Sequence, residues 1–586
     1  MSNVSLIPSQ LANTQQPGTI TRASLNKEPI AAAFILSPGY GSLLVCLLLA
    51  VALVAFYFVL IRPFVFLPAD ILAWAETSFV GDIIKLQTGV PLYTSPSDSN
   101  SVIYTPAAQL LTYAISWVFG KTTSLPAMRM IQLGFVFCAA MVATACCRKI
   151  RNLAYPNEEI AFPKTWLALT FLALFLAATA PNSNRLVHVL HADALALLMS
   201  MVCFWSILRY LEAPSLARLI LMAVCPALGY LTKQFLLAWL GVMFVFLLLQ
   251  NPRGIRRLII FTLAGVGFAA VAMGVCYLLW GDNYVFWTFK VVGGERSKIS
   301  FSPEGYHISL LRSLDHTLKA WMQIAIGVVG GLLILRGWNI RKLGPLWVAW
   351  IVLVAVEATS SGVGWNVLYH FGPGVLIGMT WMFAGLPRLW PSVSSRAELG
   401  LPHLLYWIRP LIAAGCVVTI FIALQVVPLA DQGRRRYGQR PSADVYRYIS
   451  DIEREFDGLP PEKVLLDIGN WIYLRHSVLA KDRAVPLGDQ PPNGIYENFD
   501  AMVNRIRSGA YSKILVHDLN SPRFLYDWAD WPKSSGVKDA LLEHYTEVRT
   551  IPGPEGEADF GSMIAYTGPV SVLIPKFELP GKSSTD

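Results

Sequence analysis

The chain has 586 residues, of which 54% are hydrophobic and only 15% are charged, with a mean hydropathy of +0.48. Soluble domains carry about 25% charged residues, so this composition excludes an ordinary soluble protein. The net charge of +9 does not indicate nucleic acid as a partner, because many basic residues gather in short loops between apolar runs, as membrane insertion requires.

Residues 1–41 are mostly polar, and we expect them to form a cytoplasmic N-terminal tail. The apolar run that follows, 42–64, starts too late and is too long for a cleavable signal peptide, so we interpret it as a retained anchor. Ten further apolar runs of roughly 20 residues follow, and each of them predicts a membrane-spanning helix. They cover residues 125–147, 164–181, 190–208, 215–232, 235–250, 257–280, 318–335, 344–359, 369–387 and 405–429.

Basic residues alternate between the two sides of these spans. The clusters at 148–151 and 253–257 fall on the same side as the N-terminal tail, which predicts that this side is cytoplasmic. The apolar segment 106–120 is too short to cross comfortably, and counting it as a span would move the cluster at 148–151 outside. We therefore predict a helix lying on the outer membrane surface there. The cluster at 434–436 follows the last span and falls outside in this topology, against the usual tendency.

The first outer loop, 65–124, carries Asp70, Glu76 and Asp82 at the head of an amphipathic segment. On a helix, the six residues from Glu76 to Asp82 turn through about 240°, so the two side chains do not share one face. They are alternatives for one role, a general base that takes the proton of an acceptor hydroxyl. The competing interpretation is the solvated face of an interfacial helix. Tyr93 and Tyr104 follow downstream.

Ionisable residues recur at the outer ends of later spans. His188, His191 and Asp193 lie at the outer mouth of the fourth apolar run, 190–208, and on a helix His191 and Asp193 could not both face the same side. Lys233 interrupts the apolar stretch between two spans, where an ammonium suits a phosphate oxygen. The alternatives are an interfacial histidine, a helix cap at Asp193 and a lysine that reaches toward the headgroups.

The longest outer loop, 281–317, is basic and aromatic, with Lys290, Arg296, Tyr284 and Trp287 among its residues. This composition fits a lipid-phosphate or sugar site, because aromatic rings stack on apolar sugar faces. It fits contact with anionic headgroups equally well.

From residue 441 onward the composition becomes that of a soluble domain. Together with the preceding residues, it predicts a small outer α/β domain over 430–586 that is large enough to form its own core. Helical periodicity covers 443–456 and 537–544, and short apolar runs predict strands at 463–468, 513–517 and 562–566.

Five short motifs occur in a characteristic order: Glu76 in the first outer loop, GVPLY at 89–93, YTP at 104–106, HADALALL at 191–198 and YLTKQ at 230–234. In order and spacing they resemble the GT-C class of membrane glycosyltransferases. That class includes protein O-mannosyltransferases, aminoarabinose transferases and lipopolysaccharide galacturonosyltransferases. The chain departs from the pattern at Ala75-Glu76, where many relatives carry paired acids, and at His191, where arginine is common.

The resemblance implies a GT-C-like catalytic domain over 42–429, in an α-helical polytopic membrane protein with about 11 transmembrane helices. It also implies inverting transfer of a sugar from a polyprenyl-phosphate donor, bound among membrane lipids, to an extracytoplasmic glycan, lipid or protein. No cofactor is expected, and a divalent metal stays an open question without a ligand set. The implied roles are catalytic base for Glu76, with Asp82 as its rival, so that Glu76→Gln is expected to abolish transfer. The resemblance further implies donor-phosphate binding for Lys233, Lys85 and Arg296, and substrate binding for Tyr93, Tyr104, His191 and Asp193.

Two other functions compete with this one, and all three place the protein in the inner (plasma) membrane. A transporter or flippase of lipid-linked saccharides predicts ionisable residues near mid-bilayer and inverted repeats, whereas the chain shows ionisable residues at one face and no repeat. A polysaccharide polymerase or ligase predicts a large outer loop late in the spans. The chain contains no P-loop, no GxSxG elbow and no HExxH motif, which gives ATP-driven or zinc-dependent chemistry no support.

Overall fold

The computed structural model describes part of the chain, and all structural statements below refer to that part. The described residues are 51, 62–71, 74–95, 103–156, 163–179, 189–291, 299–300, 308–335, 339–361, 371–386, 441–480, 499–517, 519, 536–554 and 568–576. The N-terminal tail, most of the first predicted span, the last predicted span at 405–429 and the basic cluster at 434–436 therefore lie outside them.

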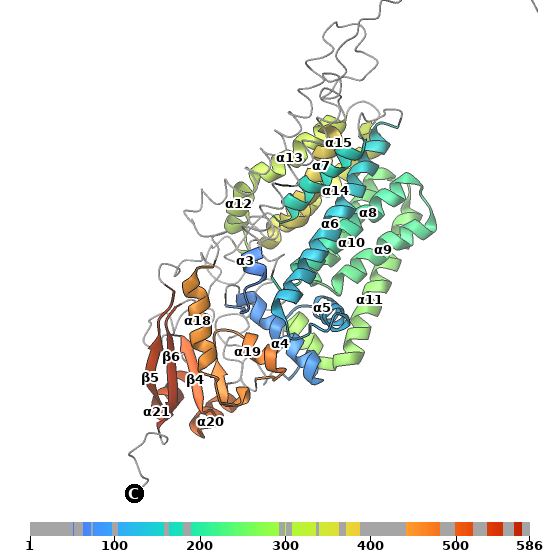
Figure 1. Ribbon diagram of the computed structural model, residues 1–586. Helices are drawn as coiled ribbons and strands as arrows, with labels where there is room; N and C mark the ends of the chain where they lie inside the picture. Colours follow the sequence, from blue (N-terminus) through green and yellow to red (C-terminus); the bar gives the residue numbers. More distant parts are fainter. Residues whose placement is uncertain are drawn as a thin grey trace, which may run out of the picture.

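A bundle of apolar helices forms the larger part of the molecule (Figure 1). Each predicted span from 125–147 to 369–387 contains a described helix. The helices are α6 (Leu125–Ala154), α7 (Pro163–Ala178), α8 (Asp193–Glu212), α9 (Leu216–Tyr230), the 3₁₀ turn η2 (Gln234–Leu237) with α10 (Ala238–Gln250), α11 (Ile255–Val285), α12 (Leu310–Lys319), α13 (Trp321–Ile334), α14 (Asn339–Ser361) and α15 (Gly372–Gly385).

Four described stretches are long and apolar enough to cross a membrane, by length and composition: α6, α8, α14 and α11 with its continuation to Val291. The start of α6 follows ordinary capping chemistry. Ser124 accepts a hydrogen bond from the N–H of Ala127 at the start of α6, and proline at the first positions of that helix needs no hydrogen-bond donor. The chain is a membrane protein built on these apolar helices.

The predicted end of the span at residue 280 coincides with a kink in the helix observed there. Helix α11 runs on to Val285 across a kink at Gly281, whose φ of 59° is open to glycine without strain. A π-helix, η3 (Phe286–Val291), continues it. The first part of the predicted outer loop is therefore helical, and the two-residue strands β1 (Ile299–Ser300) and β2 (Ile308–Ser309) pair in its later part.

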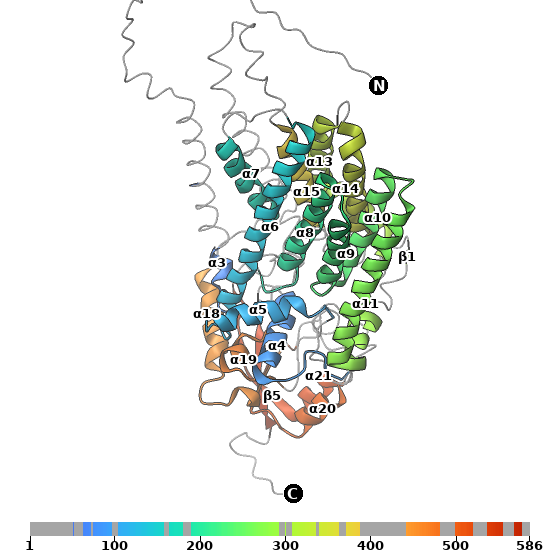
Figure 2. The same ribbon diagram turned by 90° about the vertical axis from the view of Figure 1, so that its right-hand side faces the viewer.

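Two helices lie across one end of the bundle, namely α4 (Trp74–Thr88) and α5 (Ala107–Val118), and the single turn α3 (Arg62–Val65) precedes them (Figures 1 and 2). The predicted helix at 106–120 is thus confirmed. Helix α5 is polar inside and apolar outside: Gln109 and Thr112 are buried, whereas Trp117 and Val118 are 68% and 71% exposed. An outward apolar face beside membrane-spanning helices is expected where a helix contacts lipid.

A small sheet with its own helices forms the C-terminal part of the molecule. Its strand order is β3-β4-β6-β5, with β3 parallel to β4 and the other neighbours antiparallel. The predicted helices at 443–456 and 537–544 and the predicted strands at 463–468 and 513–517 are confirmed, whereas 562–566 lies outside the described residues. The elements are α18 (Ala443–Arg454), the 3₁₀ turn η9 (Pro461–Lys463), β3 (Val464–Leu466), α19 (Trp471–His476), α20 (Asp500–Arg507), β4 (Lys513–His517), α21 (Val537–His544), β5 (Tyr545–Ile551) and β6 (Val570–Pro575).

The sheet part and the bundle meet at residues 65–124, the segment predicted as the first outer loop and named so below, where α19 packs against α4 (Figure 1). The buried carboxylate of Asp70 accepts hydrogen bonds from the backbone N–H of Asn470, at 3.0 and 3.1 Å from its two oxygens, and from that of Trp471 at 3.1 Å. The side-chain amide of Asn470 donates to the carbonyl oxygen of Thr77 at 3.0 Å. The C-terminal part therefore holds the start of α4 directly.

Candidate functional site

Glu76 lies in the first turn of α4 and is fully buried. Its Oε1 accepts hydrogen bonds from Nε of Arg129 at 2.8 Å and from the backbone N–H of Leu190 at 2.7 Å, and its Oε2 lies 2.5 Å from Nη2 of Arg129. Arg129 also donates to the carbonyl oxygens of Leu67 and Ala69. A two-pronged ion pair of this kind ties the first outer loop to α6, and it engages both oxygens of Glu76.

Asp82 lies further along α4, on a different face, as the six-residue spacing predicts. It is also buried. Its Oδ2 accepts a hydrogen bond from Nε2 of Gln109 on α5 at 3.2 Å, and its Oδ1 lies 3.8 Å from Nζ of Lys85. Both contacts are longer than those between Glu76 and Arg129, and Gln109 carries no charge.

Lys85 is fully buried one turn after Asp82, and its ammonium donates to the carbonyl oxygen of Leu92 at 2.8 Å. The next predicted residue, Tyr93, donates its hydroxyl to the carbonyl oxygen of Tyr104 at 2.6 Å. Burial, and then the negative charge of nearby Asp82, raise the pKa of Tyr93, so it stays a neutral donor. Asp82, Lys85, Tyr93 and Tyr104 are thus brought together.

His191, Asp193 and Lys233 form a second group at the bundle ends of α8 and η2. Oδ1 of Asp193 lies 2.6 Å from Nζ of Lys233, and its Oδ2 lies 2.7 Å from Nδ1 of His191. The expectation that His191 and Asp193 cannot lie on one side is wrong, because α8 begins at Asp193. His191 therefore lies in the turn before the helix, where helical spacing does not apply. His188 lies outside the described residues.

Tyr104 joins the two groups. Its ring stacks on Phe79 of α4 with centroids 5.5 Å apart, contacts the His191 ring edge-on at 5.2 Å, and lies 5.1 Å from the ammonium of Lys233. The next residue, Thr105, donates to the carbonyl oxygen of Tyr230 at 2.6 Å. The YTP and YLTKQ motifs are therefore neighbours in space, although about 125 residues separate them in the chain.

Aromatic residues at the end of α11 and in η3 contact the segment that carries Tyr93 and Thr94. Tyr284 contacts the Tyr93 ring at 5.2 Å, and the indole of the fully buried Trp287 donates to the carbonyl oxygen of Thr94 at 2.8 Å. Their rings pack against the first outer loop and do not present a face for stacking on a sugar. Lys290 is exposed, and Arg296 lies outside the described residues.

The sequence interpretation missed Arg129 and Gln109. An arginine inside an apolar run was a usable signal, because a buried guanidinium requires an acidic partner. Gln109 gave no such signal. Within the described ranges, no group of three His, Cys, Asp or Glu side chains lies close enough together to hold a metal ion.

No protein-family model matches the sequence, and no curated protein matches it either. The structure is similar to ArnT from Cupriavidus metallidurans in the apo state, with a TM-score of 0.53 and 13% identity over 92% of this chain and 98% of that chain. The same protein bound to undecaprenyl phosphate gives a TM-score of 0.50 at 13% identity, over 90% and 97%. The oligosaccharyltransferase AglB from Archaeoglobus fulgidus, in complex with an inhibitory peptide and a dolichol-phosphate, gives 0.46 at 10% identity, over 86% and 73%.

Proposed function

We propose that the protein is a glycosyltransferase of the cell envelope, because it shares the fold of ArnT, the GT-C fold of membrane glycosyltransferases, along almost its whole length. It takes a sugar from a polyprenyl-phosphate donor and transfers it, with inversion, to a hydroxyl of an extracytoplasmic glycan, lipid or protein. The reaction takes place on the outer side of the inner membrane, with the N-terminus cytoplasmic and the C-terminal part, proposed as a domain over 430–586, outside.

One observation carries the proposal: α4, the helix that carries Asp82, contacts the Tyr104 ring through Phe79, and Lys233, between α9 and η2, contacts the same ring, at the end of the bundle where α4 and α5 lie (Figure 2). Transfer from a lipid-linked donor needs a base for the acceptor and cations for the departing phosphate. It also needs both at a membrane boundary, because the donor's sugar is polar and its tail is apolar.

Asp82 is the better candidate for the base, and Glu76 is the weaker one. Glu76 is engaged by Arg129 and by the N–H of Leu190, so taking up a proton would weaken a buried ion pair. Asp82 accepts from the neutral amide of Gln109, has the ammonium of Lys85 at the longer distance of 3.8 Å, and lies near Tyr93. In the proposed step, Asp82 takes the acceptor's proton and the acceptor oxygen attacks the anomeric carbon. The bond from that carbon to the phosphate oxygen breaks, and the polyprenyl phosphate leaves.

The departing phosphate needs positive charge beyond that of Lys233. Lys233 already faces Asp193. In the described part of the site three acids are paired with three cations, so no net positive charge is left for the phosphate. The pairs are Asp82 with Lys85, Glu76 with Arg129 and Asp193 with Lys233. Lys233 keeps further N–H donors for a phosphate oxygen, because an ammonium has three. We therefore assign Arg296, on the outer segment after η3, as the additional phosphate ligand. His191 and Asp193 orient Lys233, and Tyr93 and Tyr104 shape the donor site.

The test is a reaction in proteoliposomes with a panel of radiolabelled polyprenyl-phosphate sugars and crude envelope acceptors. The proposal predicts that one donor releases free polyprenyl phosphate while its sugar appears on an acceptor. Movement of the intact donor across the bilayer would indicate a flippase, and growth of a polymer on the lipid would indicate a polymerase. Asp282→Asn, an exposed acid at the end of α11, is the matched control and should react at the wild-type rate.

A further inference from the structure

A groove lies at the end of the bundle opposite the candidate site. Helix α6 connects the two: Arg129 contacts Glu76 near its start, and Arg148 lies 19 residues further on. At 1.5 Å per residue the two arginines are about 28 Å apart along the axis, close to the thickness of a bilayer's hydrocarbon core. The groove therefore lies at the level of the other leaflet's headgroups.

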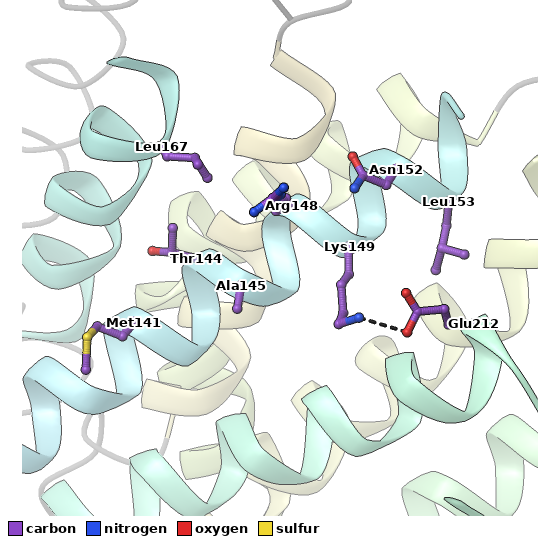
Figure 3. Close-up of a pocket in the computed structure, with 9 residues that line it drawn as sticks. All are labelled: Met141, Thr144, Ala145, Arg148, Lys149, Asn152, Leu153, Leu167 and Glu212. Atoms are coloured by element: carbon purple, nitrogen blue, oxygen red, sulfur yellow. Dashed lines mark hydrogen bonds and ion pairs between the residues drawn. The ribbon is translucent and has the colours of Figure 1, made fainter. Parts of the chain in front are cut away.

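The groove has a volume of about 600 Å³ and lies between α6, α7 and α8 (Figure 3). Most of its lining comes from one stripe of α6 at spacings of three and four residues, which place side chains on one face of a helix. The lining residues are Met141, Thr144, Ala145, Arg148, Lys149, Asn152 and Leu153 of α6, with Leu167 of α7 and Glu212 of α8.

Polarity changes along the groove. Toward the middle of α6 its lining is apolar, with Met141 and Ala145 exposed, and toward the end of the helix it becomes basic and polar at Arg148 and Asn152. Lys149 forms an ion pair with Glu212, with Nζ and Oε2 2.9 Å apart (Figure 3). The lining therefore holds two cations and one acid, and Arg148 is exposed.

We propose that this groove binds an anionic glycerophospholipid of the inner leaflet. The phosphate would meet the Arg148 guanidinium, whose planar fork matches phosphate oxygens, and one acyl chain would follow Met141 and Leu167 into the bilayer. A free phosphate would use only the basic end and leave the apolar end uncovered. The proposal concerns the opposite face from the candidate site and does not depend on the transfer reaction.

The test is native mass spectrometry of the full chain, released from nanodiscs that contain phosphatidylglycerol and phosphatidylethanolamine in equal amounts. Wild type should retain phosphatidylglycerol preferentially. Arg148→Gln should lower that preference by about fivefold, the effect expected of one basic residue near an anionic surface. Glu212→Gln should raise it, because the acid that opposes the two cations is removed. Arg256→Gln is the control, since Arg256 is exposed on α11 and does not line the groove.

Equal retention of both lipids by wild type, or the same preference in Arg148→Gln and Glu212→Gln, would overturn the proposal. Glycerol 3-phosphate at millimolar concentration should not displace the lipid. Displacement would show that the basic end alone binds phosphate, and it would refute the commitment to a lipid. The lipid counts need no enzymatic activity, so they are independent of the test of the transferase.

Discussion

Two acids on one helix, Glu76 and Asp82, have different surroundings, and the roles proposed for them rest on this difference. Glu76 is held by a buried arginine and a backbone N–H, whereas Asp82 contacts an amide and a more distant lysine. The sequence predicts that the two acids do not share a face, and the structure confirms it. The motif resemblance favours Glu76 over Asp82, and we propose the reverse order because of Arg129 and Gln109, which only the packing of α5 and α6 brings to α4.

The substitution Asp82→Asn should lower the transfer rate by about 100-fold or more, the usual contribution of a general base, without lowering the yield of folded protein. The measurement is the rate of polyprenyl phosphate release by purified protein. An unchanged rate in Asp82→Asn together with a lost rate in a well-folded Glu76→Gln would reverse the assignment.

By contrast, Glu76→Gln should act on stability. Removing one partner of a buried ion pair costs about 3–5 kcal/mol, because the remaining charge, here that of Arg129, stays buried. We expect a lower melting temperature and a lower yield of monodisperse protein in detergent, whereas Asp282→Asn should match wild type. If Glu76→Gln melts like wild type, the ion pair does not have the structural role described here.

The contact between Asp70 and the C-terminal part of the chain contributes to stability in a way that depends on pH. Burial raises the pKa of Asp70 from 3.8 to about 6, although the N–H of Asn470 acts in the opposite direction. The native state therefore holds this proton more tightly than the unfolded state, so its contribution to stability is fully present below about pH 4 and is lost as pH rises through about 6.

Asp70→Asn removes this titration while keeping a hydrogen-bond acceptor. The melting temperature of the variant should rise relative to wild type between pH 4 and pH 7, by an amount corresponding to no more than about 3 kcal/mol. Thermal unfolding in detergent across this range measures it. A difference between the two proteins that stays constant with pH would show that Asp70 does not titrate as described.

At the scale of elements, the sequence was most informative where one physical pattern dominates. Long apolar runs located the described bundle helices, helical periodicity located α18 and α21, and short apolar runs located β3 and β4. Strand β5 was not predicted, because much of it is exposed and it carries Glu547 and Arg549 amid polar residues. The continuation of α11 past Gly281 was also missed, since Gly281-Asp282-Asn283 has the composition of a turn.

Helix α5 provides a test at this scale. Its outward residues Trp117 and Val118 are apolar and its inward residues Gln109 and Thr112 are polar, so we expect its exposed end to lie among lipid chains. A nitroxide attached at position 118, in a variant whose reactive native cysteines are replaced, should collide more often with oxygen than with a water-soluble nickel complex. A label at exposed Lys121 is the control nearer water. Greater access of the nickel complex to position 118 would place α5 in water.

At the scale of the whole molecule, the first outer loop is held between two parts of the chain that are far apart in sequence. Arg129 of the bundle holds it at Glu76, and Asn470 of the C-terminal part holds it at Asp70 and Thr77. If α4 lies on the outer side, as proposed, the C-terminal part must lie there too. The sequence predicted this side for both segments from charge asymmetry. It could not predict contacts between residues that are about 400 positions apart in the chain.

A reporter enzyme fused after Asp586 tests this arrangement. Alkaline phosphatase, which folds only in the oxidising space outside the cytoplasm, should be active there, and a cytoplasmic reporter at the same position should be inactive. The same pair fused at position 152, at the end of α6, should give the opposite result. Activity of the cytoplasmic reporter after Asp586 would place the C-terminal part inside and change the number of spans.

The central claim is that Asp82, placed between α4 and α5, activates an acceptor for attack on a polyprenyl-phosphate sugar. Its most direct test is the rate at which purified wild type and Asp82→Asn release free polyprenyl phosphate from the labelled donor, alongside donor binding by each. We predict that both proteins bind donor equally and that Asp82→Asn releases at least about 100-fold less product. Equal release by the two proteins, or no release from any polyprenyl-phosphate sugar by wild type, would contradict the claim.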